Sequence, residues 1–277
     1  MAAMEYWRRS LLRATIDRYW SMNGPTWAAA VALRIIQATI PTLVFCLALV
    51  SLVIDPHTDS AARAGIAAAT PAVLRSSVVA ELTTLHNDGG IGVLSFVVLL
   101  WTGSGVFGCL ESCMARAYGT TGRSLKRQKL LAFGLWAGIA LVMALWLVWS
   151  VSRQATGARA GAIAGPSKAV SIGHMVTFML VAATIGFIYH VLPDLRLPWR
   201  HTVPGAGTAL LGGVLLSVIW PIYAHLAGQT SSSHAAFILL VAVVTYVYVF
   251  SEIAVLGIAL NAVVRERSAL STTAFQP

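Results

Sequence analysis

The sequence predicts an all-α fold, a polytopic membrane helix bundle with six transmembrane helices. Of its 277 residues, 57% are hydrophobic and only 10% are charged, whereas soluble domains carry about 25% charged residues. Apolar runs of span length recur along the whole chain. At about 1.5 Å per residue, a helix of about 20 residues crosses the hydrocarbon core of a bilayer. The chain is therefore predicted to be an integral membrane protein.

The apolar runs divide the chain into six predicted spans, which together form one transmembrane domain over residues 27–264. They lie at about residues 27–54, 91–115, 130–151, 169–192, 203–227 and 235–264. The sixth run is longer than a bilayer needs, so we expect that helix to tilt or to protrude. Residues 265–277 are predicted to form a flexible cytoplasmic tail.

Two amphipathic segments accompany the predicted spans. Residues 1–26 are predicted to lie in the cytoplasm, and residues 5–22 combine arginines with Trp, Tyr, Leu and Ile, a composition typical of a helix at the membrane interface. Residues 55–90 form the longest polar section. Apolar side chains recur there every three or four residues from Ile66 to Leu85, which predicts an outer amphipathic helix between the first two spans.

The basic residues predict the orientation of the bundle. Residues 91–110 contain no ionisable side chain, and a cluster of positive charges follows from Arg116 to Lys129. Short basic loops remain on the cytoplasmic side. With both termini inside, thirteen Lys and Arg residues lie on the inner side and five on the outer side. An N-in, C-in topology is therefore predicted.

Three sequence blocks resemble the YihY/BrkB family. They are LLWTGSGVFGCLESCMARAYG at residues 99–119, FIYHVLPDLRLPWRHTVPGAGTALLGG at residues 187–213 and LGIALNAVV at residues 256–264. The resemblance implies a six-helix protein of the bacterial inner membrane. Members once carried the label ribonuclease BN, a misassignment, and others are linked to serum resistance and, by inference, to lipid movement across the envelope.

Two positions depart from the pattern that the resemblance implies. Arg34 stands where an uncharged residue is expected, and Ala259 stands where an acidic one is expected. Glu252 lies seven residues before Ala259, which returns to nearly the same helix face. A family role for the acidic residue is therefore open at position 259.

Three ionisable residues lie well inside the predicted spans, and they form the candidate site: Arg34, Glu111 and Glu252. All three are predicted to lie about 10 to 15 Å from the cytoplasmic end of the bundle. Because an unpaired charge is costly at that depth, we hypothesise that Arg34 pairs with Glu252, with Glu111 as a second partner, beside a cavity open to the cytoplasm. Two interpretations stay open: the lining of a substrate or proton route, and a structural clamp.

Prolines and glycines mark candidate hinge or packing positions. These are Pro41, Gly103, Gly105, Gly108, Pro193 and Pro221. Pro41 should kink the first span. The three glycines fit a hinge in the second span or close packing against a neighbour. Pro193 begins what the sequence predicts to be a rigid cytoplasmic turn.

Motifs and charge placement favour transport over catalysis. No H-E-x-x-H, G-x-S-x-G or G-x-x-x-x-G-K-[ST] motif occurs, so we expect no enzyme activity, metal, cofactor or in-chain ATPase. The leading hypothesis is a transporter or flippase-like protein for a lipid or an amphipathic anionic molecule. A non-transporting scaffold or envelope-assembly factor is the alternative, and a membrane enzyme or nuclease is less favoured.

The expected partners follow from where the charges and small residues lie. The basic residues flank the spans, which favours membrane lipids over nucleic acid as the partner. Arg34 and the basic inner face favour a negatively charged, lipid-like substrate. Faces of small residues also allow a homo-oligomer.

Overall fold

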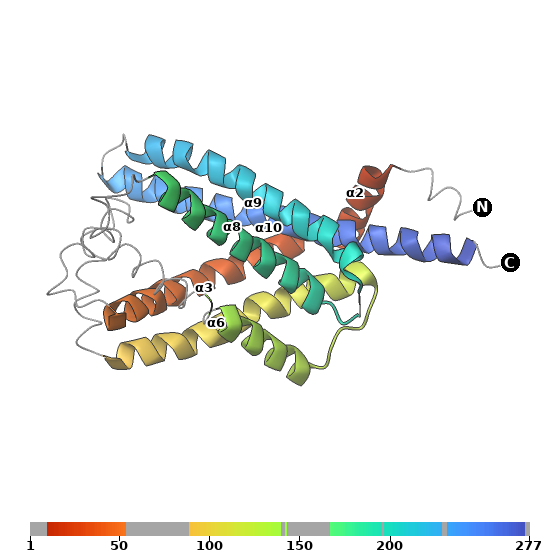
Figure 1. Ribbon diagram of the computed structural model, residues 1–277, viewed down its shortest axis with the longest axis horizontal. Helices are drawn as coiled ribbons and strands as arrows, with labels where there is room; N and C mark the ends of the chain where they lie inside the picture. The colour runs from red at the N-terminus through yellow and green to blue at the C-terminus, as the bar shows by residue number, and fades with distance from the viewer. Residues whose placement is uncertain are drawn as a thin grey trace. The chain divides into compact units, whose positions relative to one another are not determined.

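The computed structural model describes residues 10–53, 89–139, 142, 167–195, 197–228 and 232–274, and every regular element within these ranges is a helix. The helices are α2 (Leu11–Ser21), α3 (Gly24–Val53), α6 (Gly89–Tyr118), α8 (Ser167–Val191), α9 (Trp199–Gly228) and α10 (Ser232–Ala274) (Figure 1). Residues 125–139 are helical as well. The predicted all-α class is confirmed for the described chain.

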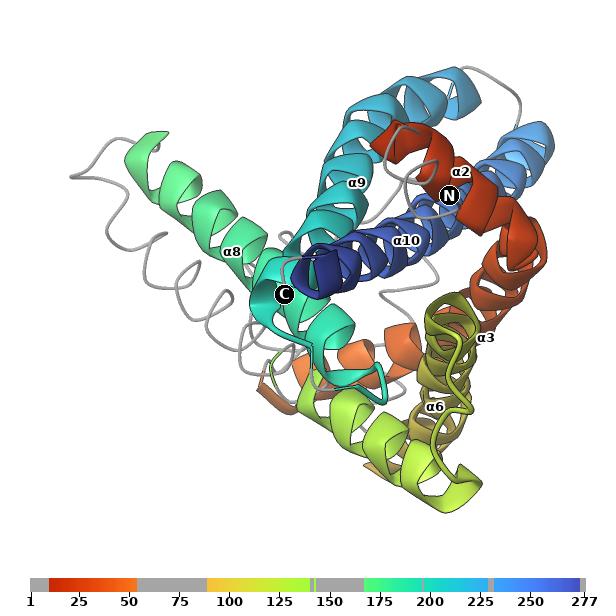
Figure 2. The same ribbon diagram turned by 90° about the vertical axis from the view of Figure 1, so that its right-hand side faces the viewer.

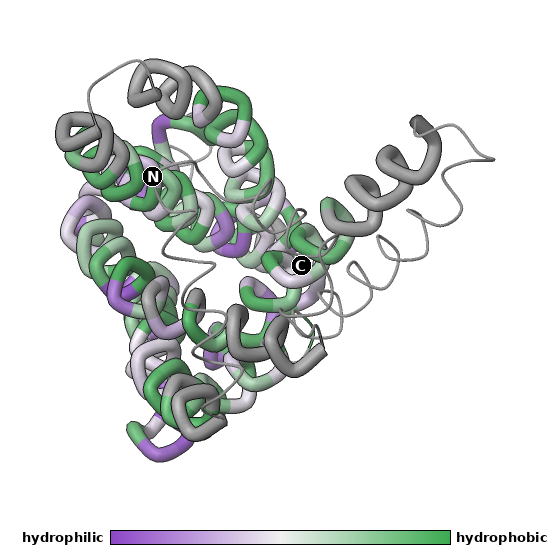
Figure 3. Tube along the Cα trace, turned by 90° about the vertical axis from the view of Figure 1, so that its left-hand side faces the viewer, coloured by the Kyte–Doolittle hydropathy of each residue, from purple (hydrophilic) through white to green (hydrophobic). Residues whose placement is uncertain are grey.

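Three of the described helices are long and apolar enough to cross a bilayer. These segments are Phe96–Tyr118 in α6, Trp199–Trp220 in α9 and Leu240–Leu270 in α10. Hydrophobic residues, green in Figure 3, predominate along the described helices. Both α3 and α8 coincide with the predicted first and fourth spans. The number of six spans and their orientation stay predictions.

Some of the predicted elements lie outside the described residues. The outer amphipathic helix at residues 66–85 is one of them, and the end of the third span at residues 143–151 is another. The interfacial helix predicted at residues 5–22 corresponds to α2, which begins at Leu11 after an N-cap formed by Ser10. The Ser10 hydroxyl accepts a hydrogen bond from the backbone N–H of Arg13 at 3.3 Å.

The last helix is longer than expected. Residues 265–274, which we expected to be a flexible tail, continue α10 to Ala274. The apolar run ends at Val264, but no glycine or proline follows between residues 258 and 276 to end the helix. Glu266 also forms an ion pair with Arg18 of α2. The end of an apolar span therefore does not coincide with the end of this helix.

The chain forms two compact units. The first consists of Met1–Ile36, Gly105–Leu130 and Met179–Pro277, and the second of Gln37–Ser104 and Leu131–Phe178. In the first unit α9 and α10 lie side by side, and α2 packs against α10 (Figures 1 and 2). In the second unit the rings of Phe45 and Phe96 lie 5.1 Å apart.

The contact between α9 and α10 depends on two glycines and one asparagine. A Cβ atom on Gly257 would lie 2.6 Å from the carbonyl oxygen of Gly205, and a Cβ on Gly205 would collide with the carbonyl of Gly257. The buried Asn261 accepts from the Gly205 N–H at 2.7 Å and donates to the Thr202 carbonyl at 3.0 Å. This close crossing places the middle of α10 beside the start of α9.

Candidate functional pocket and charged clamp

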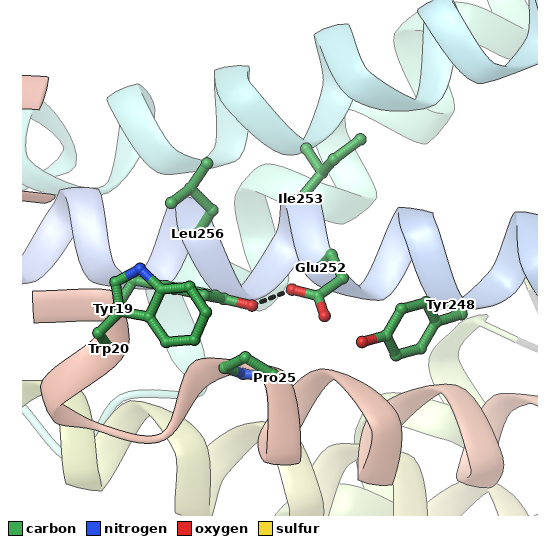
Figure 4. A pocket seen from close by; sticks show the side chains of 7 residues that line it. All are labelled: Tyr19, Trp20, Pro25, Tyr248, Glu252, Ile253 and Leu256. Atoms are coloured by element: carbon green, nitrogen blue, oxygen red, sulfur yellow. Dashed lines mark hydrogen bonds between the residues drawn. The ribbon is translucent and has the colours of Figure 1, made fainter. Parts of the chain in front are cut away.

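A pocket of about 530 Å³ lies in the first unit between α2, the start of α3 and α10. We call it the Glu252 pocket (Figure 4). Its lining residues are Tyr19, Trp20, Pro25, Tyr248, Glu252, Ile253 and Leu256. Glu252 is the acidic residue among them, and it lies within the apolar span of α10.

A tight turn brings α2 over this part of α10. Asn23 has a φ of 59°, a left-handed conformation that asparagine tolerates better than most residues. The Asn23 carbonyl then accepts from the N–H of Thr26 at 3.1 Å, which starts α3. The Tyr19 ring lies directly against Gly24, where any side chain would collide with it. The turn therefore holds Tyr19 and Trp20 on the pocket side.

Two tyrosine hydroxyls approach the Glu252 carboxylate. The Tyr19 hydroxyl donates a hydrogen bond to Oε2 of Glu252, and the Tyr248 hydroxyl points toward the same carboxylate from one turn earlier on α10 (Figure 4). Burial, together with the hydrogen bond to Glu252, holds the pKa of Tyr19 well above its ordinary value. Tyr19 therefore remains protonated and keeps its role as a donor.

The second acidic residue, Glu111 of α6, has different surroundings. Its side chain is only 3% exposed, and its Oε1 lies 3.5 Å from Nη1 of Arg123. Arg123 also pairs with Asp194, with 3.1 Å between Nε and Oδ1. The same guanidinium donates to the carbonyls of Leu192, Val191 and Pro193 at 2.8, 3.2 and 3.1 Å. We call this set the Arg123 clamp.

The comparisons with known proteins identify the family of the chain. The family model described as Virulence factor BrkB matches residues 15–276. The chain belongs to the BrkB virulence factor family. That match includes the helices that form the Glu252 pocket and the Arg123 clamp. The resemblance seen in the three sequence blocks is confirmed.

One curated relative of this BrkB family chain is the ribonuclease-like protein YfkH of Bacillus subtilis. It is 23% identical over 271 residues, which cover 94% of this chain and 97% of YfkH. No solved structure matches the chain.

The structure gives Glu111 and Glu252 of this BrkB family member separate close partners. Glu111 has Arg123, and Glu252 has Tyr19. Arg34 is exposed on α3 and is not among the residues that line the Glu252 pocket. A Cβ atom on Gly105 of α6 would lie 3.3 Å from the Cδ of Arg34. The hypothesis that Arg34 pairs with Glu252 stays a prediction.

The candidate hinge and packing positions have different surroundings in this BrkB family chain. A side chain at Gly103 would collide with the ring of Trp136. The Gly108 carbonyl accepts from Nε2 of Gln128 at 3.1 Å. Pro193 is buried within the Arg123 clamp. Pro41 and Pro221 lie inside α3 and α9, and their hinge roles stay predictions.

Sequence reasoning missed the residues that surround the two carboxylates, among them Tyr248, Arg123, Tyr19 and Trp20. Tyr248 lies four residues before Glu252, so helical spacing could have indicated it. Arg123 lies in the basic cluster that predicts the orientation of the second span, and no local pattern distinguishes it from its neighbours. Tyr19 and Trp20 lie in a segment whose composition predicts a membrane-surface helix. No local pattern connects them with α10.

Proposed function

We propose that this membrane protein is a transporter or flippase-like protein that moves a lipid or an amphipathic molecule, and that the Glu252 pocket receives the substrate. The observation that carries the proposal is the position of the Glu252 carboxylate, which lines a pocket within an apolar span. Ionisable side chains inside spans are costly and commonly mark substrate or ion pathways.

The contrast with Glu111 supports a pathway at Glu252 over a structural clamp. Glu111 is buried and forms an ion pair with Arg123, as expected for a residue that holds two elements together. The residues around Glu252 leave an open pocket instead. A carboxylate whose purpose is packing gains nothing from an adjacent cavity, whereas a substrate-binding carboxylate requires one.

The pocket also has the dimensions and surface of a ligand site. Its volume of about 530 Å³ falls within the range of about 300 to 1,000 Å³ that is common for small-molecule pockets. Aromatic and aliphatic side chains surround the polar groups, which suits an amphipathic molecule.

Without an ATPase motif in the sequence, movement would be passive, coupled to an ion or driven by a partner. We place the protein in the bacterial inner membrane with both termini in the cytoplasm.

A lipid translocation assay in proteoliposomes tests this proposal. Phospholipids labelled on the acyl chain are bleached from outside, so that movement between leaflets appears as additional bleaching. We compare the native protein with Glu252→Gln and with Glu252→Asp, a matched control that keeps a carboxylate at the same position of the pocket lining. We expect native and control proteins to move lipid and Glu252→Gln to be at least about tenfold slower, because the amide keeps the shape of the side chain but lacks the charge that strengthens its hydrogen bonds.

Two outcomes would contradict the proposal. If folded native protein moves no lipid or amphiphile, the scaffold alternative gains support. If Glu252→Gln moves lipid as fast as the native protein, the Glu252 pocket is not the route.

A further inference from the structure

We infer that the Glu252 pocket recognises an ammonium group, either primary or quaternary, carried by an amphipathic molecule. The inference rests on the proposed function, because it assigns a chemical class to the substrate of the same pocket. It follows from the charge of the pocket and from the kind of side chains around that charge.

The charge of the Glu252 pocket favours a cation. Glu252 lies in an apolar span, and none of the described residues that line the pocket is basic. Tyr19 donates one hydrogen bond to the carboxylate, and the hydroxyl of Tyr248 points toward it (Figure 4). Hydroxyl donors orient a carboxylate but do not neutralise its charge. A bound cation would do so, and neutralisation is worth most where water is scarce.

The aromatic side chains of the pocket also favour a cation. Tyr19, Trp20 and Tyr248 bring three aromatic side chains to the pocket. The rings of Tyr19 and Trp20 lie 5.6 Å apart and nearly perpendicular, at 81°, so the edge of one ring meets the face of the other. Aromatic faces attract cations, and quaternary ammonium groups are commonly bound by such side chains.

The rest of the pocket lining is apolar. Pro25, Ile253 and Leu256 offer aliphatic surface, which suits the methyl or methylene groups attached to an ammonium nitrogen. An anionic group would meet the Glu252 carboxylate and be repelled by it. The negatively charged substrate favoured by the sequence would therefore have to keep its anionic part outside this pocket.

A binding experiment with two matched probes tests the inference. The full chain is purified in maltoside detergent, which carries neither charge nor ammonium. Hexyltrimethylammonium is compared by calorimetry with its neutral isostere, in which carbon replaces the quaternary nitrogen. We expect native protein and Glu252→Asp, which keeps the carboxylate, to prefer the charged probe by at least about tenfold, and Glu252→Gln to lose this preference.

A second variant keeps the test decisive if Glu252→Gln fails to fold. The Trp20 side chain is 64% exposed, so its replacement in Trp20→Leu should leave the packing intact. We expect this variant to bind the charged probe severalfold more weakly and the neutral probe almost as before. Equal binding of the two probes by native protein would overturn the inference, as would an unchanged preference in Glu252→Gln.

Transport measurements then distinguish the source of the ammonium group. Faster movement of acyl-labelled phosphatidylethanolamine than of phosphatidylglycerol would identify a lipid headgroup. Uptake of hexyltrimethylammonium without lipid preference would identify a soluble amphipathic amine. Probe binding without any movement would retain the inference and contradict the proposed function. Equal movement of both lipids without probe preference would retain the function and overturn the inference.

Discussion

At the scale of the residue, the Arg123 clamp shows why an arginine is needed after α6. One guanidinium contacts five acceptors: two carboxylates and three successive carbonyls. Those carbonyls lie where α8 ends, and the last carbonyls of a helix have no partner within the helix. Arginine offers five N–H donors in a planar fork, whereas lysine offers a single charged point. The clamp therefore joins the end of α8 to Glu111 of α6.

Replacing Arg123 should destabilise the folded protein. In Arg123→Met the carbonyls lose their donor and Glu111 becomes a buried carboxylate without its cation, so we expect a loss of about 3 to 5 kcal/mol in the free energy of unfolding. The measurement is detergent-induced unfolding of purified protein. In Arg123→Met with Glu111→Gln, part of the loss should return, because the uncompensated charge is gone. Strictly additive single effects would show that the two residues do not interact.

At the scale of the element, α9 and α10 approach each other through backbone rather than through side chains. Gly205 and Gly257 face each other so closely that neither can carry a Cβ without a shift. The hydrogen bonds of Asn261 to Gly205 and Thr202 then set the register of the two helices. The hydroxyl of Tyr189 on α8 also donates to the carbonyl of Ala254 on α10 at 2.6 Å. Register matters here because it also sets where Glu252 lies.

A pair of glycine substitutions tests this crossing. Gly257→Ala should destabilise the protein by about 1 to 3 kcal/mol, because the added methyl group overpacks the contact with Gly205. Gly207→Ala is the control: it lies on α9, and a Cβ there meets no atom within 4 Å. The control should be neutral or more stable by up to about 1 kcal/mol, because alanine favours a helix over glycine. Thermal unfolding of both variants checks the difference, and equal effects would contradict a close crossing.

At the scale of the whole molecule, the topology is the property most open to direct measurement. We expect both termini in the cytoplasm, because the inner loops carry the excess of positive charge. The native cysteines Cys46, Cys109 and Cys113 are first replaced by alanine or serine. A single cysteine at Gln276→Cys should then react with a membrane-impermeant maleimide only after the cells are opened. A cysteine at Asp59→Cys should react in intact spheroplasts, and the reverse pattern would invert the topology.

The sequence predicted the helices better than it predicted their contacts. The bounds of α3, α8 and α9 lie within four residues of the predicted spans, because hydropathy is a local property of the chain. The sequence also predicts Glu252 and Glu111 as candidate site residues, because a charged side chain inside an apolar run is conspicuous. Their partners were not found, because Tyr19 and Arg123 lie in segments that read as a surface helix and a basic loop.

By itself, the sequence determined that this is a helical membrane protein of the BrkB family. Backbone polar groups in a bilayer must be satisfied within each segment, so apolar helices can be recognised one at a time. Only the tertiary structure decided which groups meet. Tyr19 and Glu252 are 233 residues apart in the chain, and Arg123 and Leu192 are 69 apart. Such contacts depend on how distant helices pack, and it is this packing that leaves one carboxylate sealed and the other beside a pocket.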